Sequence, residues 1–482
     1  VPLLPSLSPV TWLLLVAFLC LVALYGIWPY QTFKKLGIPG PLPLPFVGTF
    51  LEYRHGVHNF DQKCFEKYGK IWGFYDGRQP VLAVLDPIFI KNILVKECYN
   101  IFTNRRVALN MAEDEQWKRI RTVLSPAFTS GKLKEMFHII NHYGEKLVKN
   151  IEKKVANDEF VTAKDIFGAY SMDVVTSISF SVNVDFMNNP NDPFVSNIKK
   201  FLQFSFLSPV FLLLVLFPFV IPVLEKMKVT LLPSDVMDFF KNVFTEMKKE
   251  REKGRVALPS LMTGILNSQG LITVIFSFLY VLLCLFSALS DEEVLAQALI
   301  FVFAGYETTS STLSYIAYNL ATHRDVQQRL QDECCVLSPP VPLPGLSHYN
   351  AIIQMEYLDM VVSESIRLYP TGLSGVTIPE GMVVLIPAFV LHRDPQYWPE
   401  PDEFRPERFS KENKEGIDPY TFLPFGAGPR NCIGMRFALL VMKVAVVVLL
   451  QNFSFRPCKD TPLLMLFLKS LYRSIFNVGG MF

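Results

Sequence analysis

Hydrophobic residues are unevenly spread along this chain of 482 residues, and the first long apolar block spans residues 10–28. The block carries no charge, and as a helix rising about 1.5 Å per residue it would reach about 28 Å, enough to cross the hydrocarbon core of a bilayer. Trp12, Tyr25 and Trp28 lie near its ends, where aromatic side chains favour the membrane interface. The pattern therefore predicts an N-terminal transmembrane helix.

The flanks of this block predict its orientation. Lys34 and Lys35 follow it and no basic residue precedes it, so the positive-inside rule places the bulk of the chain in the cytoplasm. A cleaved signal peptide would need a basic leading region, a shorter apolar core and a small-residue cleavage site, and none of these is clear. We expect residues 1–28 to form an uncleaved, single-pass membrane anchor.

Prolines punctuate the stretch that follows the anchor. Because repeated prolines fix φ and prevent a helix, residues 29–46 are predicted to form a stiff proline-rich linker. Beyond the linker there is no repeat and no low-complexity segment. We therefore expect residues 47–482 to form one catalytic domain.

Within that domain, a short β pattern at residues 71–85 gives way to apolar positions at helical spacing. Together these patterns predict a mainly α protein with small β-sheets. The predicted helices span residues 117–124, 137–155, 235–251, 291–322, 325–335, 351–368 and 435–450.

Charge and cysteine content narrow the functional classes. The 46 basic and 44 acidic residues give a net charge of only +2, and without a long basic block nucleic-acid binding is not expected. Eight cysteines are scattered without Cys-x-x-Cys or zinc-site spacing, so a reducing compartment fits better than a disulfide framework. The 41 phenylalanines indicate a lipophilic interior or membrane contact.

Residues 425–434 carry the strongest chemical signal, because they place Cys432 in a loop rich in glycine and apolar residues, just before a predicted helix. A lone cysteine is usually a small buried hydrophobe. Here glycine lets the backbone approach a flat ring closely, and Arg430 offers a guanidinium fork to a carboxylate. A cysteine thiolate below haem iron favours O–O bond cleavage, and this loop has the composition such a ligand requires.

A second signal lies at the centre of the predicted helix 291–322, whose start carries a capping-box pattern at Ser290 and Glu293. Ala304 and Gly305 leave room for a flat ring or a diatomic ligand. The polar and β-branched residues that follow are poor helix formers and predict a local widening of the helix. Taken alone, the segment would be a Ser/Thr-rich kink in a buried helix.

The spacing F-x-x-G-x-R-x-C-x-G resembles the haem-binding signature of the cytochrome P450 superfamily, and the segment 304–308 is similar to its oxygen-activation motif, A-G-x-[D/E]-T. The resemblance implies the cytochrome P450 fold and haem b as cofactor. It also implies Cys432 as the axial iron ligand, Thr308 as the catalytic alcohol and Glu307 as the acid that delivers protons. The other haem contacts that it implies are Phe425, Gly428, Arg430, Gly434, Ala304 and Gly305.

Further residues match the family outside the cysteine loop. Trp117 and Arg121 fit its W-x-x-x-R pattern, which contacts haem propionates, and Arg105 is a weaker propionate candidate. Glu364 and Arg367 are three residues apart and share one helix face. The resemblance implies that they form a buried structural network with Arg408 of a downstream P-E-R-F segment.

Stretches such as residues 33–41, 129–136 and 354–362 are similar to vertebrate microsomal members of subfamily 3A. That similarity implies a large phenylalanine-rich pocket. The uncharged stretch 201–223, interrupted by three prolines, is then either a membrane-dipping lid or simply core. Candidate pocket residues are Phe204, Phe206, Phe211 and Phe303.

The resemblance implies an unspecific monooxygenase in the endoplasmic reticulum membrane, with its catalytic domain in the cytoplasm. It would oxidise steroids, drugs and other lipophilic xenobiotics with O2. Electrons would come from NADPH through NADPH-cytochrome P450 reductase, aided by a b-type cytochrome. The chain itself has no Gly-x-Gly-x-x-Gly after a strand that would bind NADPH.

Two alternatives remain at this stage. A haem-thiolate isomerase needs no reductase and no proton relay, so the Glu307-Thr308 pair argues against it. A catalytically impaired variant, or a gene-model error, is favoured by departures from the family pattern. The departures are short segments after Arg106 and at 370–378, an apolar run at 271–287 where a second membrane crossing is rejected, and an atypical tail after Asp460.

Overall fold

The computed structural model describes residues 8–104, 114–157, 161–180, 185–186, 188–189, 192–202, 220, 226, 234–252, 289–336, 345–371, 374–377 and 382–458. The chain divides into two compact units. Unit 1 comprises Val1–Arg106, Phe206–Leu231 and Leu373–Leu391, and unit 2 comprises Val107–Ser205, Leu232–Gly372 and His392–Phe482. Each unit is described by itself.

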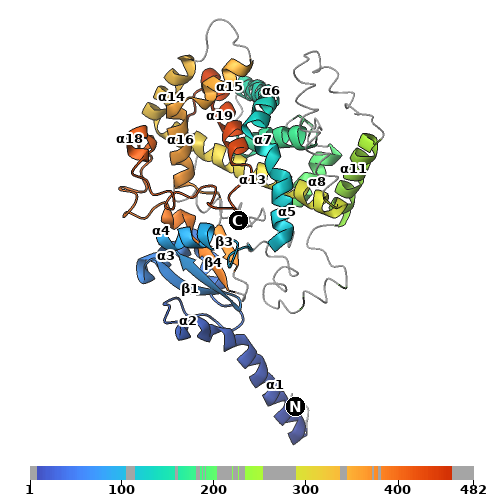
Figure 1. Ribbon diagram of the computed structural model, residues 1–482, viewed down its shortest axis with the longest axis vertical. Helices are drawn as coiled ribbons and strands as arrows, with labels where there is room; N and C mark the ends of the chain where they lie inside the picture. The colour runs from blue at the N-terminus through green and yellow to red at the C-terminus, as the bar shows by residue number, and fades with distance from the viewer. Residues whose placement is uncertain are drawn as a thin grey trace. The chain divides into compact units, whose positions relative to one another are not determined.

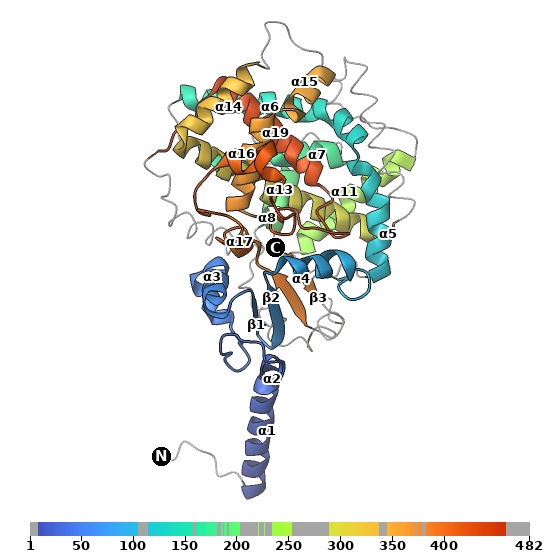
Figure 2. The ribbon, with the colours of Figure 1, turned by 60° about the vertical axis from the view of Figure 1, so that its left-hand side comes forward.

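Unit 1 is built on a four-stranded sheet in the order β1-β2-β4-β3. The first two strands form the antiparallel hairpin predicted at residues 71–85, with Ile71 opposite Val84. β2 pairs in parallel with β4, and β4 pairs antiparallel with β3. Figure 2 shows the α3 helix beside this sheet. The strands are β1 (Ile71–Asp76), β2 (Gln79–Val84), β3 (Ser374–Thr377) and β4 (Val383–Ile386).

Short helices make up the rest of unit 1, apart from the long first helix. They are α1 (Pro9–Ile27), η1 (Trp28–Tyr30), α2 (Gln31–Lys35), η2 (Phe50–His55), α3 (Val57–Tyr68), α4 (Pro87–Lys91), η3 (Asn92–Lys96) and α17 (Ala388–Leu391).

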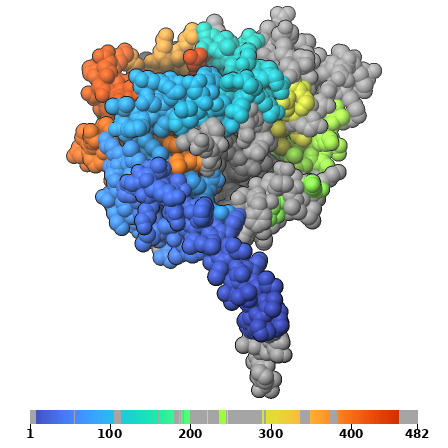
Figure 3. All heavy atoms as spheres, turned by 60° about the horizontal axis from the view of Figure 1, so that its bottom comes forward, coloured from blue at the N-terminus to red at the C-terminus, as the bar shows by residue number. Residues whose placement is uncertain are grey.

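The apolar side chains of α1 are exposed, and the helix stands out from the other N-terminal residues of its unit (Figure 3). Its last turn is nevertheless tied to the β1–β2 turn, because the Arg78 guanidinium lies 3.3 Å from the Tyr25 ring centroid and its Nε donates to the Tyr25 carbonyl at 2.8 Å. The proline-rich stretch also contacts the sheet, since the Gly73 N–H donates to the Pro39 carbonyl at 2.9 Å. The linker is therefore packed against the sheet, and the C-terminal end of α1 makes defined contacts with the rest of unit 1.

The described residues of unit 2 are mostly helical, and the longest helix among them, α13, runs between the others (Figure 1). Contacts to α13 come from α7, α11, α14, α16 and α19. The helices are α5 (Asp114–Leu124), η4 (Ser125–Phe128), α6 (Ser130–Ala156), α7 (Ala163–Phe180), α8 (Pro193–Leu202), α11 (Ser234–Glu252), α13 (Asp291–Thr322), α14 (Arg324–Val336), α15 (Gly345–Ile353), α16 (Glu356–Leu368), η7 (Pro406–Phe409), α18 (Lys411–Lys414) and α19 (Met435–Asn452).

Two glycines allow α7 and α13 to approach closely. A Cβ on Gly305 would lie 2.4 Å from Val175 Cγ2, and a Cβ on Gly168 would lie 2.8 Å from the ring of Tyr306. Real Cβ contacts are never this short, so each helix presents a glycine to a side chain of the other. This seam fixes the part of α13 that carries the predicted acid and alcohol.

The predicted fold class is confirmed: the described residues are mainly helical, with one small sheet. One predicted helix, residues 351–368, is wrong in extent, because α15 ends at Ile353 and α16 begins at Glu356. The break is stabilised from outside, since the Glu333 carboxylate of α14 accepts the N–H groups of Tyr357 and Leu358, both at 3.1 Å. An acidic group at a helix start satisfies N–H groups that have no partner within the helix.

Two described helical segments are long and apolar enough to cross a membrane, Pro9–Lys35 and Met435–Asn452. The first is almost entirely exposed, whereas the second, α19, is mostly buried within unit 2. α19 also carries Lys443, whose ammonium pairs with Asp359 at 2.5 Å. α19 is therefore a core helix, and Pro9–Lys35 remains as the candidate membrane span.

Candidate haem-thiolate site

The cysteine loop is folded back on itself by backbone hydrogen bonds. The Cys432 N–H donates to the Phe425 carbonyl at 2.9 Å, and the Asn431 N–H donates to the Gly428 carbonyl at 3.1 Å. Gly426 and Gly428 have φ values of 70° and 71°, in the left-handed region that glycine adopts without strain. The glycines of the motif therefore make the turn that brings the two ends of the loop together.

Cys432 lies just before α19, whose N-cap is Gly434. The positive end of a helix dipole and the N–H groups of its first turn stabilise a nearby anion, so this position favours the thiolate form of cysteine. The thiol is exposed, while the next residue, Ile433, packs against a cluster that includes Ile120 of α5 and Val294 of α13. The loop is thus anchored through Ile433, while Cys432 stays exposed.

The structure brings α5 to the cysteine loop, as the sequence motifs predict. The Arg121 guanidinium donates to the backbone carbonyl of Asn431 at 3.0 Å and to its side-chain oxygen at 2.8 Å. The Arg430 guanidinium lies 3.9 Å from the Trp117 ring centroid, a cation–π contact. Two cations and an indole therefore gather beside Cys432, which is the charge that two propionates would need.

α5 is also tied to the start of α13. Gln116 donates to Glu293 at 2.9 Å, and Arg119 forms an ion pair with the same carboxylate. Glu293 closes the predicted capping box with Ser290, which the structure confirms. One carboxylate thus links the helix that holds Trp117 to the helix that holds Thr308.

The central part of α13 differs from the predicted widening. The helix is α-helical from Asp291 to Thr322, so the expected widened turn is not found in it. Thr308 Oγ1 instead donates to the Ala304 carbonyl at 2.6 Å, four residues back, and Thr312 bonds in the same way to Thr308. Such back-bonding satisfies polar side chains inside a regular helix, which is why the polar run does not break α13.

A lysine that the sequence did not single out holds Glu307. Lys164 of α7 donates to Glu307 Oε1 at 2.8 Å and to Ser311 Oγ at 2.7 Å. Burial lowers the pKa of Lys164, and the carboxylate of Glu307 opposes that shift. The second oxygen, Glu307 Oε2, is buried and has no hydrogen-bond partner among the described residues. A buried polar atom of this kind is suited to accept a hydrogen bond from water or a ligand.

The small residues of the α13 motif are explained in part by packing. A side chain on Gly305 would collide with Val175 of α7, so the contact between the two helices is enough to require a glycine there. Ala304 is half-buried, and its carbonyl accepts the Thr308 hydroxyl. Phe303 packs against a buried cluster that includes Met172 and Phe240. The haem role of Ala304 and Gly305 and the pocket role of Phe303 stay predictions.

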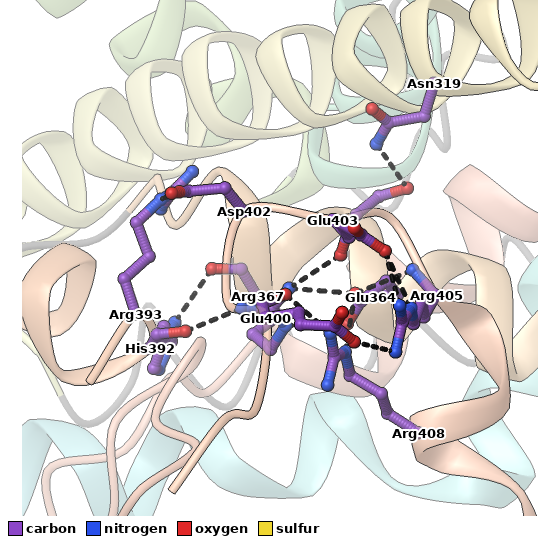
Figure 4. A network of polar contacts seen from close by, with 11 residues as sticks. Asn319, Glu364, Arg367, His392, Arg393, Glu400, Asp402, Glu403, Arg405 and Arg408 are labelled. Atoms are coloured by element: carbon purple, nitrogen blue, oxygen red, sulfur yellow. Dashed lines mark hydrogen bonds and ion pairs between the residues drawn. The ribbon is translucent and has the colours of Figure 1, made fainter. Parts of the chain in front are cut away.

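The predicted network of three charges is present behind the loop, and Figure 4 shows it from close by. Glu364 and Arg367 are fully buried and meet through two bonds of 2.7 and 2.8 Å. Arg408 Nε lies 3.3 Å from Glu364 Oε1, and the Arg405 N–H donates to the same oxygen at 3.0 Å. The carboxylate is thus fully engaged, which a buried charge requires.

A histidine missing from the sequence motifs completes this network. His392 is fully buried, and its carbonyl accepts from Arg367 at 2.7 Å. Its Nδ1 lies 3.2 Å from the Arg367 carbonyl, and its Nε2 accepts the Leu423 N–H at 2.9 Å. Burial and the nearby Arg367 charge lower the pKa of His392 to about 3. No local sequence pattern marks this residue, because its partners come from distant segments.

Several predicted residues and segments lie outside the described residues. They are Arg105, Phe204, Phe206 and Phe211, the apolar run 271–287 and the tail after Asp460. The short segment 370–378 is described in part, and it contains β3.

Comparisons with known proteins agree with this geometry. The sequence model of the family described as "Cytochrome P450" matches residues 38–475. Cytochrome P450 3A12 of Canis lupus familiaris is 54% identical to this chain over 95% of the chain and 93% of its own length. Cytochrome P450 3A29 of Sus scrofa is 55% identical, and cytochrome P450 3A5 of Homo sapiens is 52% identical, each over the same shares. The chain therefore belongs to the cytochrome P450 family, as a monooxygenase similar throughout to members of subfamily 3A.

Proposed function

We propose that this chain is a haem b monooxygenase in which Cys432 is the axial iron ligand. The observation that carries the proposal is the closed cysteine loop, with its thiol exposed ahead of α19 and with Arg121 and Arg430 beside it. When bound, haem supplies the activation of O2, and a thiolate ligand favours O–O bond cleavage.

Two observations on the described residues fit that cofactor. Gly426 and Gly428 turn the loop with positive φ values and carry no side chains, so a flat ring can approach the backbone there. On α13, Glu307 Oε2 is a buried polar atom without a partner among the described residues. A polar acceptor of this kind suits a water that carries protons.

Each side chain of the site has a definite task in this proposal. Arg121 and Arg430 would bind the two propionates by charge, and Trp117, which stacks with the Arg430 guanidinium, would donate its indole N–H to one of them. The Glu307 carboxylate accepts from Lys164 on Oε1, and its Oε2 would accept a hydrogen bond from a water that carries protons. The Thr308 hydroxyl donates to Ala304, so its lone pairs remain to accept a hydrogen bond from water. Together Glu307 and Thr308 would position a water and relay its protons.

We further propose that α1 anchors the chain in the endoplasmic reticulum membrane, with both units in the cytoplasm. Support comes from the exposed apolar surface of Pro9–Lys35 and from Lys34 and Lys35 at its end. The substrates would be steroids, drugs and other lipophilic xenobiotics, and electrons would come from NADPH through NADPH-cytochrome P450 reductase, aided by a b-type cytochrome. The relatives named P450 3A support the monooxygenase class on which these proposals depend.

Reconstituted turnover tests the proposed function. The full chain in lipid vesicles with NADPH and the reductase should oxidise a lipophilic steroid, and Thr308→Ala should lower product formed per NADPH while peroxide release rises. Thr312→Ala is the matched control, because this hydroxyl makes the same type of back-bond one turn further along α13. Turnover that is independent of NADPH and reductase would instead indicate an isomerase.

A further inference from the structure

His392 joins the salt-bridge network to the segment that enters the cysteine loop. Figure 4 shows His392 beside Arg367, and the two residues exchange hydrogen bonds: the Arg367 guanidinium donates to the His392 carbonyl at 2.7 Å, and His392 Nδ1 lies 3.2 Å from the Arg367 carbonyl. Arg367 is in turn held by Glu364. The backbone and one ring nitrogen of His392 are therefore committed to the network.

The other ring nitrogen faces the loop. His392 Nε2 accepts the Leu423 N–H at 2.9 Å, the Leu423 carbonyl accepts the Gly426 N–H at 3.2 Å, and the Phe425 carbonyl accepts the Cys432 N–H at 2.9 Å. Because Leu423 donates, Nε2 must be bare, so the ring proton lies on Nδ1 and is donated to the Arg367 carbonyl. Only one neutral tautomer satisfies both partners.

The neutral form persists at any ordinary pH. His392 is fully buried, and burial together with the Arg367 charge lowers its pKa to about 3. Leu423 is also buried, so its N–H would have no water to replace the imidazole. The hydrogen bond between His392 and Leu423 is therefore shielded from water and is retained at any ordinary pH.

We propose that His392 is a positioning residue for the Cys432 thiolate, acting through the hydrogen bond between its Nε2 and the Leu423 N–H. The bond ties the entry of the cysteine loop to the buried Glu364–Arg367 pair, and it would thereby hold the Cys432 sulfur in position to bind iron. The inference rests on the proposed role of Cys432 as iron ligand. A residue that served the Arg367 network alone would need only its carbonyl and Nδ1.

Two amide variants separate these roles. In His392→Gln the side-chain oxygen can reach the position of Nε2 and accept the Leu423 N–H. In His392→Asn the shorter amide can reach only the position of Nδ1, so it can donate to the Arg367 carbonyl but leaves Leu423 without an acceptor. Both variants keep the backbone carbonyl that Arg367 uses.

The first readout is the carbon monoxide difference spectrum of the reduced full chain in detergent. Wild type and His392→Gln should keep the thiolate-type red-shifted Soret band during mild heating. His392→Asn should convert to the unshifted form about tenfold faster, the factor expected for the loss of one buried hydrogen bond. The inference is overturned if His392→Asn converts no faster than His392→Gln.

The second readout does not depend on haem. Hydrogen exchange followed by mass spectrometry of the haem-free chain should show faster exchange in the peptide 422–432 for His392→Asn, and wild-type exchange for His392→Gln. Equal exchange in both variants and wild type contradicts the proposed link, even where the spectra differ. If the wild-type protein lacks the red-shifted band, the role of Cys432 itself is refuted. If the wild-type band is normal and both variants behave like wild type, only the role of His392 is refuted.

Discussion

Glu364→Gln is the most informative single change in the buried network. The carboxylate of Glu364 is fully buried and accepts four N–H groups: two from Arg367 at 2.7 and 2.8 Å, the backbone N–H of Arg405 at 3.0 Å and one from Arg408 at 3.3 Å. The substitution keeps the shape of the side chain and removes its charge. It also turns an amide NH2 toward groups that can only donate.

The size of the stability loss depends on the charges that stay buried without a partner after Glu364→Gln. Arg367 is fully buried, and breaking a buried pair leaves an uncompensated charge, which costs about 3–5 kcal/mol. Arg408, whose side chain is 11% exposed, can turn toward water and adds little. We therefore expect the free energy of unfolding of Glu364→Gln to fall by about 3–5 kcal/mol.

Urea titration of the detergent-solubilised full chain, followed by tryptophan fluorescence, measures this loss. Trp398 is a local reporter, because its ring centroid lies 5.3 Å from the Arg367 guanidinium. Glu356→Gln is the matched control: it makes the same chemical change on the same helix, in an exposed ion pair with Lys411, and should cost less than about 1 kcal/mol. An equal loss of stability in both variants would show that burial of the Glu364–Arg367 pair does not set this cost.

Three further predictions concern other parts of unit 2. Gly305→Ala places a Cβ 2.4 Å from Val175 and should lower the free energy of unfolding by about 1–3 kcal/mol, measured by urea titration; an unchanged midpoint would contradict the close helix seam. Lys164→Met removes the bond to Glu307 Oε1 and should raise peroxide release per NADPH several-fold, whereas Lys164→Arg should restore most of the coupling; equal coupling in both variants would show that the ammonium is not needed. Burial raises the pKa of Asp173 to about 7, so the folded chain holds a proton that the unfolded chain loses near pH 4. Stability should therefore fall as pH rises from about 4 to about 7, and thermal melts of Asp173→Asn should lack this fall.

The sequence predicted the long helices with local signals and missed elements that depend on tertiary contacts. α13 begins and ends where predicted, because Ser290 and Glu293 mark its start. The break between α15 and α16 had no local signal, since the carboxylate that stabilises it belongs to Glu333 of another helix. α7 was not predicted at all: it is buried along most of its length, so its apolar residues show no clear helical face.

In the candidate site, too, residues with local sequence signals were predicted and residues that depend on tertiary contacts were missed. Cys432, Thr308 and Arg121 were found because a motif fixes their neighbours in the sequence. Lys164 and His392 were missed because each gains its role from a partner more than twenty residues away, and a single lysine or histidine carries no spacing signal. The polar run after Gly305 misled the prediction of a widened helix, since back-bonding to carbonyls four residues earlier cannot be read from composition.

The carbon monoxide difference spectrum of the reduced chain reports directly on the ligand of haem iron. If Cys432 is that ligand, the wild-type protein should show a red-shifted Soret band of the thiolate type. Cys432→Ser should lose that band, with the far-ultraviolet circular dichroism unchanged. A wild-type spectrum without the red shift, or a Cys432→Ser spectrum that keeps it, would contradict the assignment of Cys432 as the ligand of haem iron.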